Sequence, residues 1–115
     1  MVRGGAFFRR KAGRRDENHA AIRDGLRKLG HLVVDLAGVG DGVADLLVFP
    51  RGEWAGCVFV EVKTEDGERN AAQIRFAAAM RPRGIRVAVA RTLHDALIAI
   101  QAPARSGRRR NRGGE

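Results

Sequence analysis

The chain has 115 residues, of which 44% are hydrophobic and 30% charged, and it contains a single cysteine. This length suits one globular domain, and the composition argues against a membrane span, an internal disulfide framework and a cysteine-based zinc site. The first residues also lack the apolar stretch of a secretory signal, so we expect a cytoplasmic protein with no membrane partner.

The positive charge is concentrated at the two ends of the chain. The net charge is +9, yet residues 16–104 carry 11 basic and 12 acidic side chains, a net of −1. We therefore expect a nearly neutral domain over 16–104, between a basic N-terminal arm (1–15) and an Arg/Gly-rich C-terminal tail (105–115). Arginine pairs phosphate oxygens, so these segments favour contact with nucleic acid; the alternative is that they are solvated termini that aid solubility.

The first predicted element is a helix over about residues 17–29. Ile22, Leu26 and Leu29 recur at the spacing of one helical face, and Gly30 stands where a helix end favours a left-handed residue. Three short strands rich in β-branched residues follow, separated by turns that contain glycine or proline. They are predicted at residues 31–36, 44–49 and 57–63.

The second half of the chain alternates between helix and strand. Asn70 is a favourable N-cap for a helix that ends at Met80. Residues 85–90 are predicted to form a continuous apolar strand with one arginine, of the kind buried on both faces, and Thr92 caps a last helix over 93–101. A hairpin joins the second and third strands, and the intervening helix makes the third and fourth strands parallel. The predicted fold class is α/β, a mixed four-stranded sheet flanked by helices in the order α-β-β-β-α-β-α.

Three charged residues interrupt the apolar strand segments. Glu61 and Lys63 point to the same face, and Asp45 on the neighbouring hairpin strand can lie beside Glu61 there. Two adjacent carboxylates near a core repel each other unless a cation lies between them, and oxygen ligands suit Mg²⁺ or Mn²⁺. Lys63 could then orient a water or stabilise charge on a phosphate. The alternative is a solvated strand face with an exposed Glu61–Lys63 ion pair.

The order of the predicted helices and strands, together with these charged residues, resembles the PD-(D/E)xK nuclease core and more narrowly the VRR-NUC domain. The resemblance covers nearly all of residues 16–100. The resemblance implies a restriction-endonuclease-like core. Two departures from the family pattern are Ala44, in place of the usual proline, and the start of the second helix at residues 70–72. The matching motifs are Glu17 on the first helix, Gly42-Val43-Ala44-Asp45 before a strand, Glu61-Val62-Lys63, Gln73 on the second helix, and the closing strand from Gly84 to Ala90.

The resemblance also implies the metal ligands. Asp45 and Glu61 would bind Mg²⁺ or Mn²⁺ directly, together with the backbone carbonyl of Val62. Glu17 would complete the acidic cluster, either directly or through water. From the residues alone, however, Glu17 is predicted to be a helix-start acid that favours the positive end of the helix dipole.

Two further roles follow from the same resemblance. Lys63 would be the catalytic lysine, and Gln73 would position a water or a backbone phosphate, although by pattern alone Gln73 is a surface residue. Trp54, in the turn of the hairpin, either stacks on nucleic-acid bases or folds back over the sheet edge.

The expected function is therefore that of a metal-dependent endodeoxyribonuclease. Stand-alone members of this size resemble homodimeric Holliday-junction resolvases, which implies branched DNA as the partner and, for a bacterial or phage protein, the bacterial or host cytoplasm. Two alternatives remain: a non-catalytic nucleic-acid-binding module on the same fold, and a general or restriction-type nuclease.

Overall fold

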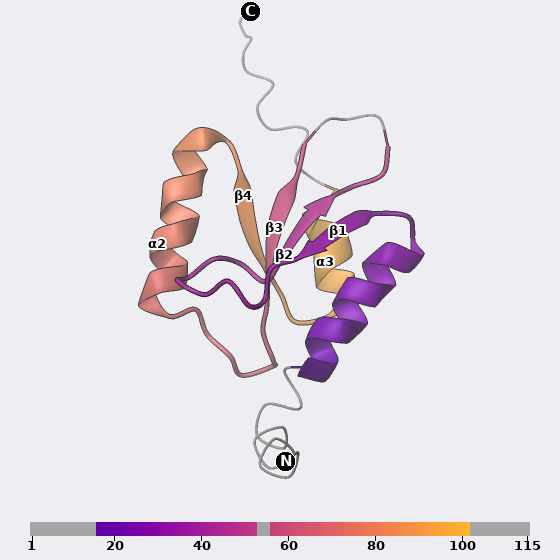
Figure 1. Cartoon of the computed structure of the whole chain (residues 1–115), viewed down its shortest axis with the longest axis horizontal. Coiled ribbons are helices and arrows are strands. Elements are labelled where there is room, and N and C mark those ends of the chain that lie inside the picture. Colours follow the sequence, from indigo (N-terminus) through magenta and orange to yellow (C-terminus); the bar gives the residue numbers. More distant parts are fainter. Residues whose placement is uncertain (1–15, 53–55, 102–115) are drawn as a thin grey trace, which may run out of the picture.

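The computed structural model describes residues 16–52 and 56–101, and the predicted order of elements is confirmed (Figure 1). The two basic terminal segments and Trp54 lie outside the described residues. Among the described residues, each helix is too short or too polar to span a bilayer. A helix over residues 16–28 comes first. It is followed by β1 (Leu32–Asp35), β2 (Leu46–Phe49), β3 (Val58–Val62), α2 (Ala71–Met80), the 3₁₀ turn η1 (Arg81–Arg83), β4 (Arg86–Ala90) and α3 (Leu93–Ala99).

The strands form one mixed sheet in the order β1-β2-β3-β4. β2 pairs antiparallel with both β1 and β3, as the predicted hairpin requires. β4 pairs parallel with β3, and α2 lies in the connection between them, as expected from the alternation of helix and strand. Because β3 is a central strand, Glu61 near its end is fully buried, whereas Lys63, directly after the strand, is partly exposed.

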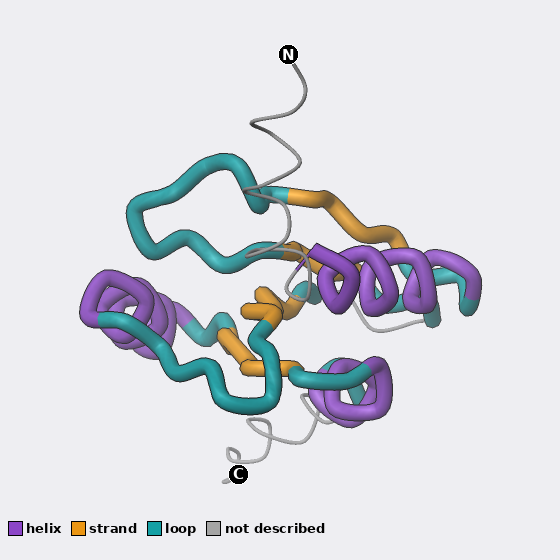
Figure 2. Tube along the Cα trace, turned by 90° about the horizontal axis from the view of Figure 1, so that it is seen from below, coloured by secondary structure: helices purple, strands orange, loops and turns teal. Residues whose placement is uncertain are grey.

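Each face of the sheet packs against different helices. Figures 1 and 2 show the first helix and α3 on one side and α2 on the other. The main hydrophobic core lies on the side of the first helix and α3, where the alternate apolar residues of the strands meet the apolar faces of both helices. This core consists of Ile22, Leu26, Val33, Leu46, Val48, Val58, Val60, Val62, Ala90, Ala96 and Ile100.

The opposite face carries the charged residues of β3. Phe59 packs edge to face against Phe76 of α2, with ring centroids 5.1 Å apart. Because side chains alternate along a strand, Glu61 and Lys63 lie on the same face as Phe59. α2 therefore covers the side of the sheet on which the candidate site lies.

Gly42 allows the loop before β2 to approach the start of α2. Its φ is +81°, and a Cβ at this position would clash with the backbone carbonyl of Ala72. Glycine is the residue that tolerates both the left-handed backbone and the close approach. This contact holds the loop against the start of α2 at a point three residues before Asp45.

Two expectations about burial are wrong. Leu29 does not extend the buried helical face but is 45% exposed, because the helix ends at residue 28 and Gly30 turns the chain with a φ of +98°. The strand expected to be buried on both faces, β4, is an edge strand in which only Ala90 is buried. An edge strand lacks a neighbour on one side, so its other residues are only half-buried.

Candidate active site

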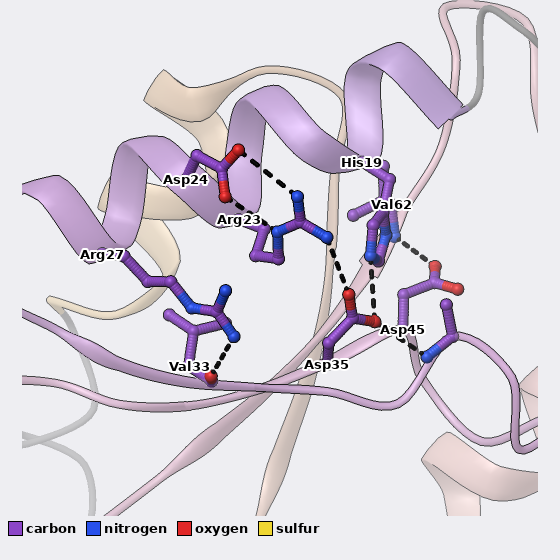
Figure 3. A network of polar contacts seen from close by, with 9 residues as sticks. His19, Arg23, Asp24, Arg27, Val33, Asp35, Asp45 and Val62 are labelled. Carbon is purple, nitrogen blue, oxygen red and sulfur yellow. Dashed lines mark hydrogen bonds and ion pairs between the residues drawn. The ribbon is translucent and has the colours of Figure 1, made fainter.

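Asp45 lies immediately before β2, at the point where β2 and β3 separate. Leu46 pairs with Val60, so continuing this register by one residue places Asp45 opposite Glu61. One carboxylate oxygen of Asp45, Oδ2, accepts a hydrogen bond from the Val62 N–H at 2.8 Å (Figure 3). The structure therefore brings Asp45 to the strand segment that carries the Glu-Val-Lys motif.

Glu61 is fully buried, and among the described residues it is the one charged side chain with this degree of burial. Its Oε1 accepts a hydrogen bond from Arg69 Nε at 2.8 Å, whereas its Oε2 is buried without a hydrogen-bond partner. The alternative of an exposed Glu61–Lys63 ion pair is therefore wrong. A buried carboxylate oxygen without a partner is costly, and a bound cation would remove that cost.

Lys63 and Gln73 are joined directly. Lys63 Nζ donates to Gln73 Oε1 at 2.8 Å, and the Asn70 N–H donates to the same oxygen at 2.9 Å. The Asn70 side chain in turn accepts from the Gln73 N–H, which completes a capping box at the start of α2. The first turn of α2 thus holds the ammonium group of Lys63, a contact that the pattern did not predict for Gln73.

Asn18 ties the first helix to the ends of two strands. Its Nδ2 donates to the backbone carbonyl of Lys63 at 2.8 Å and to that of Arg91 at 3.1 Å. Sequence reasoning missed this residue. The signal was present, because Asn18 lies one helical turn before Ile22 and two turns before Leu26, on the face that is otherwise apolar.

Glu17 is exposed and lines a cleft of about 400 Å³ at the end of β3. Within residues 16–52 and 56–101, no three histidine, cysteine, aspartate or glutamate side chains lie close enough to hold one metal ion. Glu17 does not therefore form a compact triad with Asp45 and Glu61 in this structure. The cleft is lined by Glu17, Asn18, Ala21, Thr64, Glu65, Asp66 and Arg91.

A network of charged side chains borders Asp45 on the side of β1 (Figure 3). Asp35, the last residue of β1, contacts His19 Nε2 and Arg23 Nη1, both at 3.0 Å. Partial burial acts to raise the pKa of Asp35, but hydrogen bonds from the Ala37 N–H, His19 and Arg23 together lower the pKa to about 2. The network connects the first helix to the sheet beside the candidate site.

Asp35→Asn is expected to make the free energy of unfolding depend less on pH between about pH 4 and pH 2. The pKa of Asp35 in the folded state lies below the ordinary value of 3.8, so its stabilising effect is present above about pH 4 and is lost as the pH falls toward 2. Because the side chain is partly exposed, we expect a loss of about 0.5–1 kcal/mol at pH 7. Urea midpoints between pH 2 and 7 measure this difference, and parallel profiles for the variant and the wild type would contradict it.

The residues present fit a hard divalent cation. Asp45 and Glu61 provide carboxylate oxygens from adjacent strands, and Glu61 Oε2 is a buried acceptor without a donor. Mg²⁺ and Mn²⁺ prefer such oxygen ligands and keep several waters, so two carboxylates can suffice on the protein side. The roles of the Val62 carbonyl and of Glu17 as further ligands stay predictions.

The mixed sheet with paired carboxylates and a lysine on one face defines the restriction-endonuclease-like class of α/β folds. Among solved structures, the chain matches one described as a "VRR_NUC domain", with 30% sequence identity and a TM-score of 0.58, over 80% of this chain and 96% of that one. The chain belongs to the VRR-NUC family, and its function is therefore of the nuclease type. No family model and no curated protein matches the sequence.

Proposed function

We propose that this protein is a metal-dependent endonuclease that hydrolyses phosphodiester bonds in DNA, and that it cuts four-way junctions as a homodimer. The observation that carries the proposal is Glu61, which is fully buried, has one carboxylate oxygen without a partner and lies opposite Asp45. Lys63 lies two residues farther along the chain, directly after β3, and points to the same face of the sheet. A cation held by two carboxylates next to a lysine suits phosphodiester hydrolysis.

The chain's own residues have separate roles in this proposal. A bound Mg²⁺ or Mn²⁺ would activate water and neutralise charge on the scissile phosphate. Asp45, oriented by the Val62 N–H, and Glu61 would hold the ion. Lys63 would donate hydrogen bonds to the oxygen atoms on which charge develops. Gln73 keeps the ammonium of Lys63 at the site, since the N-cap of α2 fixes the position of its side-chain oxygen.

The proposed homodimer would use the edge of the sheet at β1, beside which the described residues place no further strand. Leu32 is 63% exposed, and Val34 and Phe49 are each 38% exposed. Leu32 pairs with Phe49 across β1 and β2, so these side chains form one apolar surface beside an edge strand. A single domain has one site, and symmetric cutting of two DNA strands requires two sites related by a two-fold axis.

Deleting residues 105–115 is expected to weaken DNA binding without removing cleavage. Residues 16–104 have a net charge of −1, whereas the deleted segment carries five arginines. Each neutralised phosphate contributes about 0.9 to the slope of log affinity against log salt, so the slope should fall by up to about 4. Fluorescence anisotropy over a salt series measures the slope. An unchanged affinity would show that the tail does not contact DNA.

The test of the proposed function is a cleavage assay on three DNA substrates of matched sequence. A four-way junction, a linear duplex and a single strand are incubated with Mg²⁺, Mn²⁺ or EDTA, and sedimentation gives the mass of the protein in solution. Metal-dependent, symmetric cuts in the junction by a dimer would support the full proposal. Cutting of all three substrates would show a general nuclease without a preference for junctions. Salt-sensitive DNA binding without cleavage would favour a non-catalytic binding module.

A further inference from the structure

Arg69 is held at two points beside the buried carboxylate. It lies in the loop between β3 and α2, directly before the N-cap Asn70. Its Nε donates to Glu61 Oε1 at 2.8 Å, and its Nη2 donates to the Val87 carbonyl of β4, also at 2.8 Å. The Arg69 side chain is 27% exposed, whereas that of Glu61 is 0% exposed. The arginine therefore reaches from the surface to a group that water does not reach.

The two contacts fix the orientation of the Glu61 carboxylate. A guanidinium group is planar, so anchoring Nη2 on β4 also determines the direction of the Nε–H bond. Oε1 of Glu61 is thereby occupied, and Oε2 is left as the oxygen without a donor. A carboxylate restrained in this way presents one defined oxygen to a ligand and does not rotate between two equivalent ones.

We propose that Arg69 is a positioning residue for the metal site: it holds Oε1 of Glu61 so that Oε2 binds the divalent cation as a single-oxygen ligand. The identity of the ligand as Mg²⁺ or Mn²⁺ rests on the proposed function. In this proposal Arg69 acts through Glu61 and is not itself a ligand of the ion. Groups that orient metal ligands in this way typically change metal affinity by about 10–100-fold when they are replaced.

Lysine cannot replace this arginine, although it conserves the charge. Its ammonium is a single point donor on a flexible stem, so it cannot hold Glu61 and the Val87 carbonyl in one fixed plane. Arg69→Lys should therefore keep a positive charge near Glu61 but no longer fix the orientation of the Glu61 carboxylate. The expected result is about 10-fold weaker metal binding in a protein that is still folded.

Arg91→Lys provides the matched control. Arg91 Nη2 donates to the Gly67 carbonyl of the same loop, and Arg91 lines the same surface cleft as Arg69. Its side chain has no hydrogen bond or ion pair with Glu61. The substitution thus removes one guanidinium contact to the loop and leaves the Glu61–Arg69 pair intact, and we expect it to change Mn²⁺ affinity by less than about twofold.

The experiment measures Mn²⁺ binding to the full chain, without DNA, from the electron paramagnetic resonance signal of the free ion. A second measurement follows the urea midpoint as Mn²⁺ is added, so that a destabilised variant still reports its affinity through linkage. We expect Arg69→Lys to need about 10-fold more Mn²⁺ in both measurements. At saturating Mn²⁺, its single-turnover cleavage rate should return to near the wild-type rate, which a general structural defect would not allow.

The outcomes separate the two proposals. If the wild type binds Mn²⁺ and Arg69→Lys binds it equally well, Arg69 does not position the site, while the metal site itself stands. If Arg69→Lys and Arg91→Lys weaken Mn²⁺ binding equally, the loss of affinity comes from disturbing the loop between β3 and α2. It then does not come from losing the contact between Arg69 and Glu61, and the inference fails. If the wild type does not bind Mn²⁺ and does not cleave DNA, the proposed function and this inference both fail.

Discussion

Lys63→Ala is expected to lower the rate of DNA cleavage by about 100–1000-fold while the affinity for a four-way junction stays near that of the wild type. Removing a donor that stabilises developing charge on a reacting group costs this much in other enzymes. The binding should survive because the expected DNA contacts lie in the basic termini, outside the neutral domain. Single-turnover cleavage and anisotropy on the same junction measure the two quantities.

The control for this variant is Arg75→Ala, which also removes one positive charge. Arg75 is exposed on α2, the helix that carries Gln73. This substitution therefore tests whether the loss of any positive charge near the site slows cleavage. We expect its cleavage rate to stay within about twofold of wild type, since exposed charges contribute little at a distance. A rate for Lys63→Ala within tenfold of the wild type would remove Lys63 from the mechanism. Equal losses of binding and cleavage would indicate misfolding.

Asp45→Asn is expected to lower Mn²⁺ affinity by at least about 100-fold and to abolish cleavage at ordinary metal concentrations, because loss of a direct ligand exceeds the effect of losing a group that orients one. The fold should be retained, since the asparagine side-chain oxygen can accept the same hydrogen bond from the Val62 N–H. Calorimetric titration with Mn²⁺, together with the urea midpoint, separates ligand loss from unfolding.

Asp41→Asn is the matched control for this second variant. Asp41 is exposed in the loop before β2 and has a φ of +58°, a conformation that asparagine tolerates. The substitution removes the same charge four residues away without touching Val62. If both variants weaken Mn²⁺ binding to the same extent, the effect is one of local charge, and Asp45 is not a ligand.

Helices and strands whose apolar residues recur with a regular period could be predicted from the sequence. The spacing of Ile22 and Leu26 specified the buried face of the first helix, and the turn at Pro50 bounded β2. Alternation along β2 and β3 also placed Asp45 on the same face as Glu61, because a shift of one residue would turn the apolar side chains of a strand away from the core. These inferences hold because each depends only on neighbouring residues and the period of the element.

The partners of the charged side chains were not predictable from the same patterns. Arg69 reaches Glu61 from an irregular loop, where no period indicates which way a side chain points. By pattern alone Gln73 is a surface residue, because its position on α2 does not reveal that Lys63 approaches from the sheet. The exposure of Leu29 depends on the residue at which the helix ends, which is the least certain feature of a helical pattern.

The bridge made by Asn18 joins the first helix to segments that are synthesised much later. Its side chain holds carbonyls that lie 45 and 73 residues farther along the chain. During translation, Arg91 leaves the ribosome long after Asn18, and contacts of such large sequence separation form late. A nascent or prematurely terminated chain that lacks β4 thus has Glu61 and Lys63 without the framework that supports them. Any activity that depends on this site is therefore expected to appear only after β4 has been synthesised.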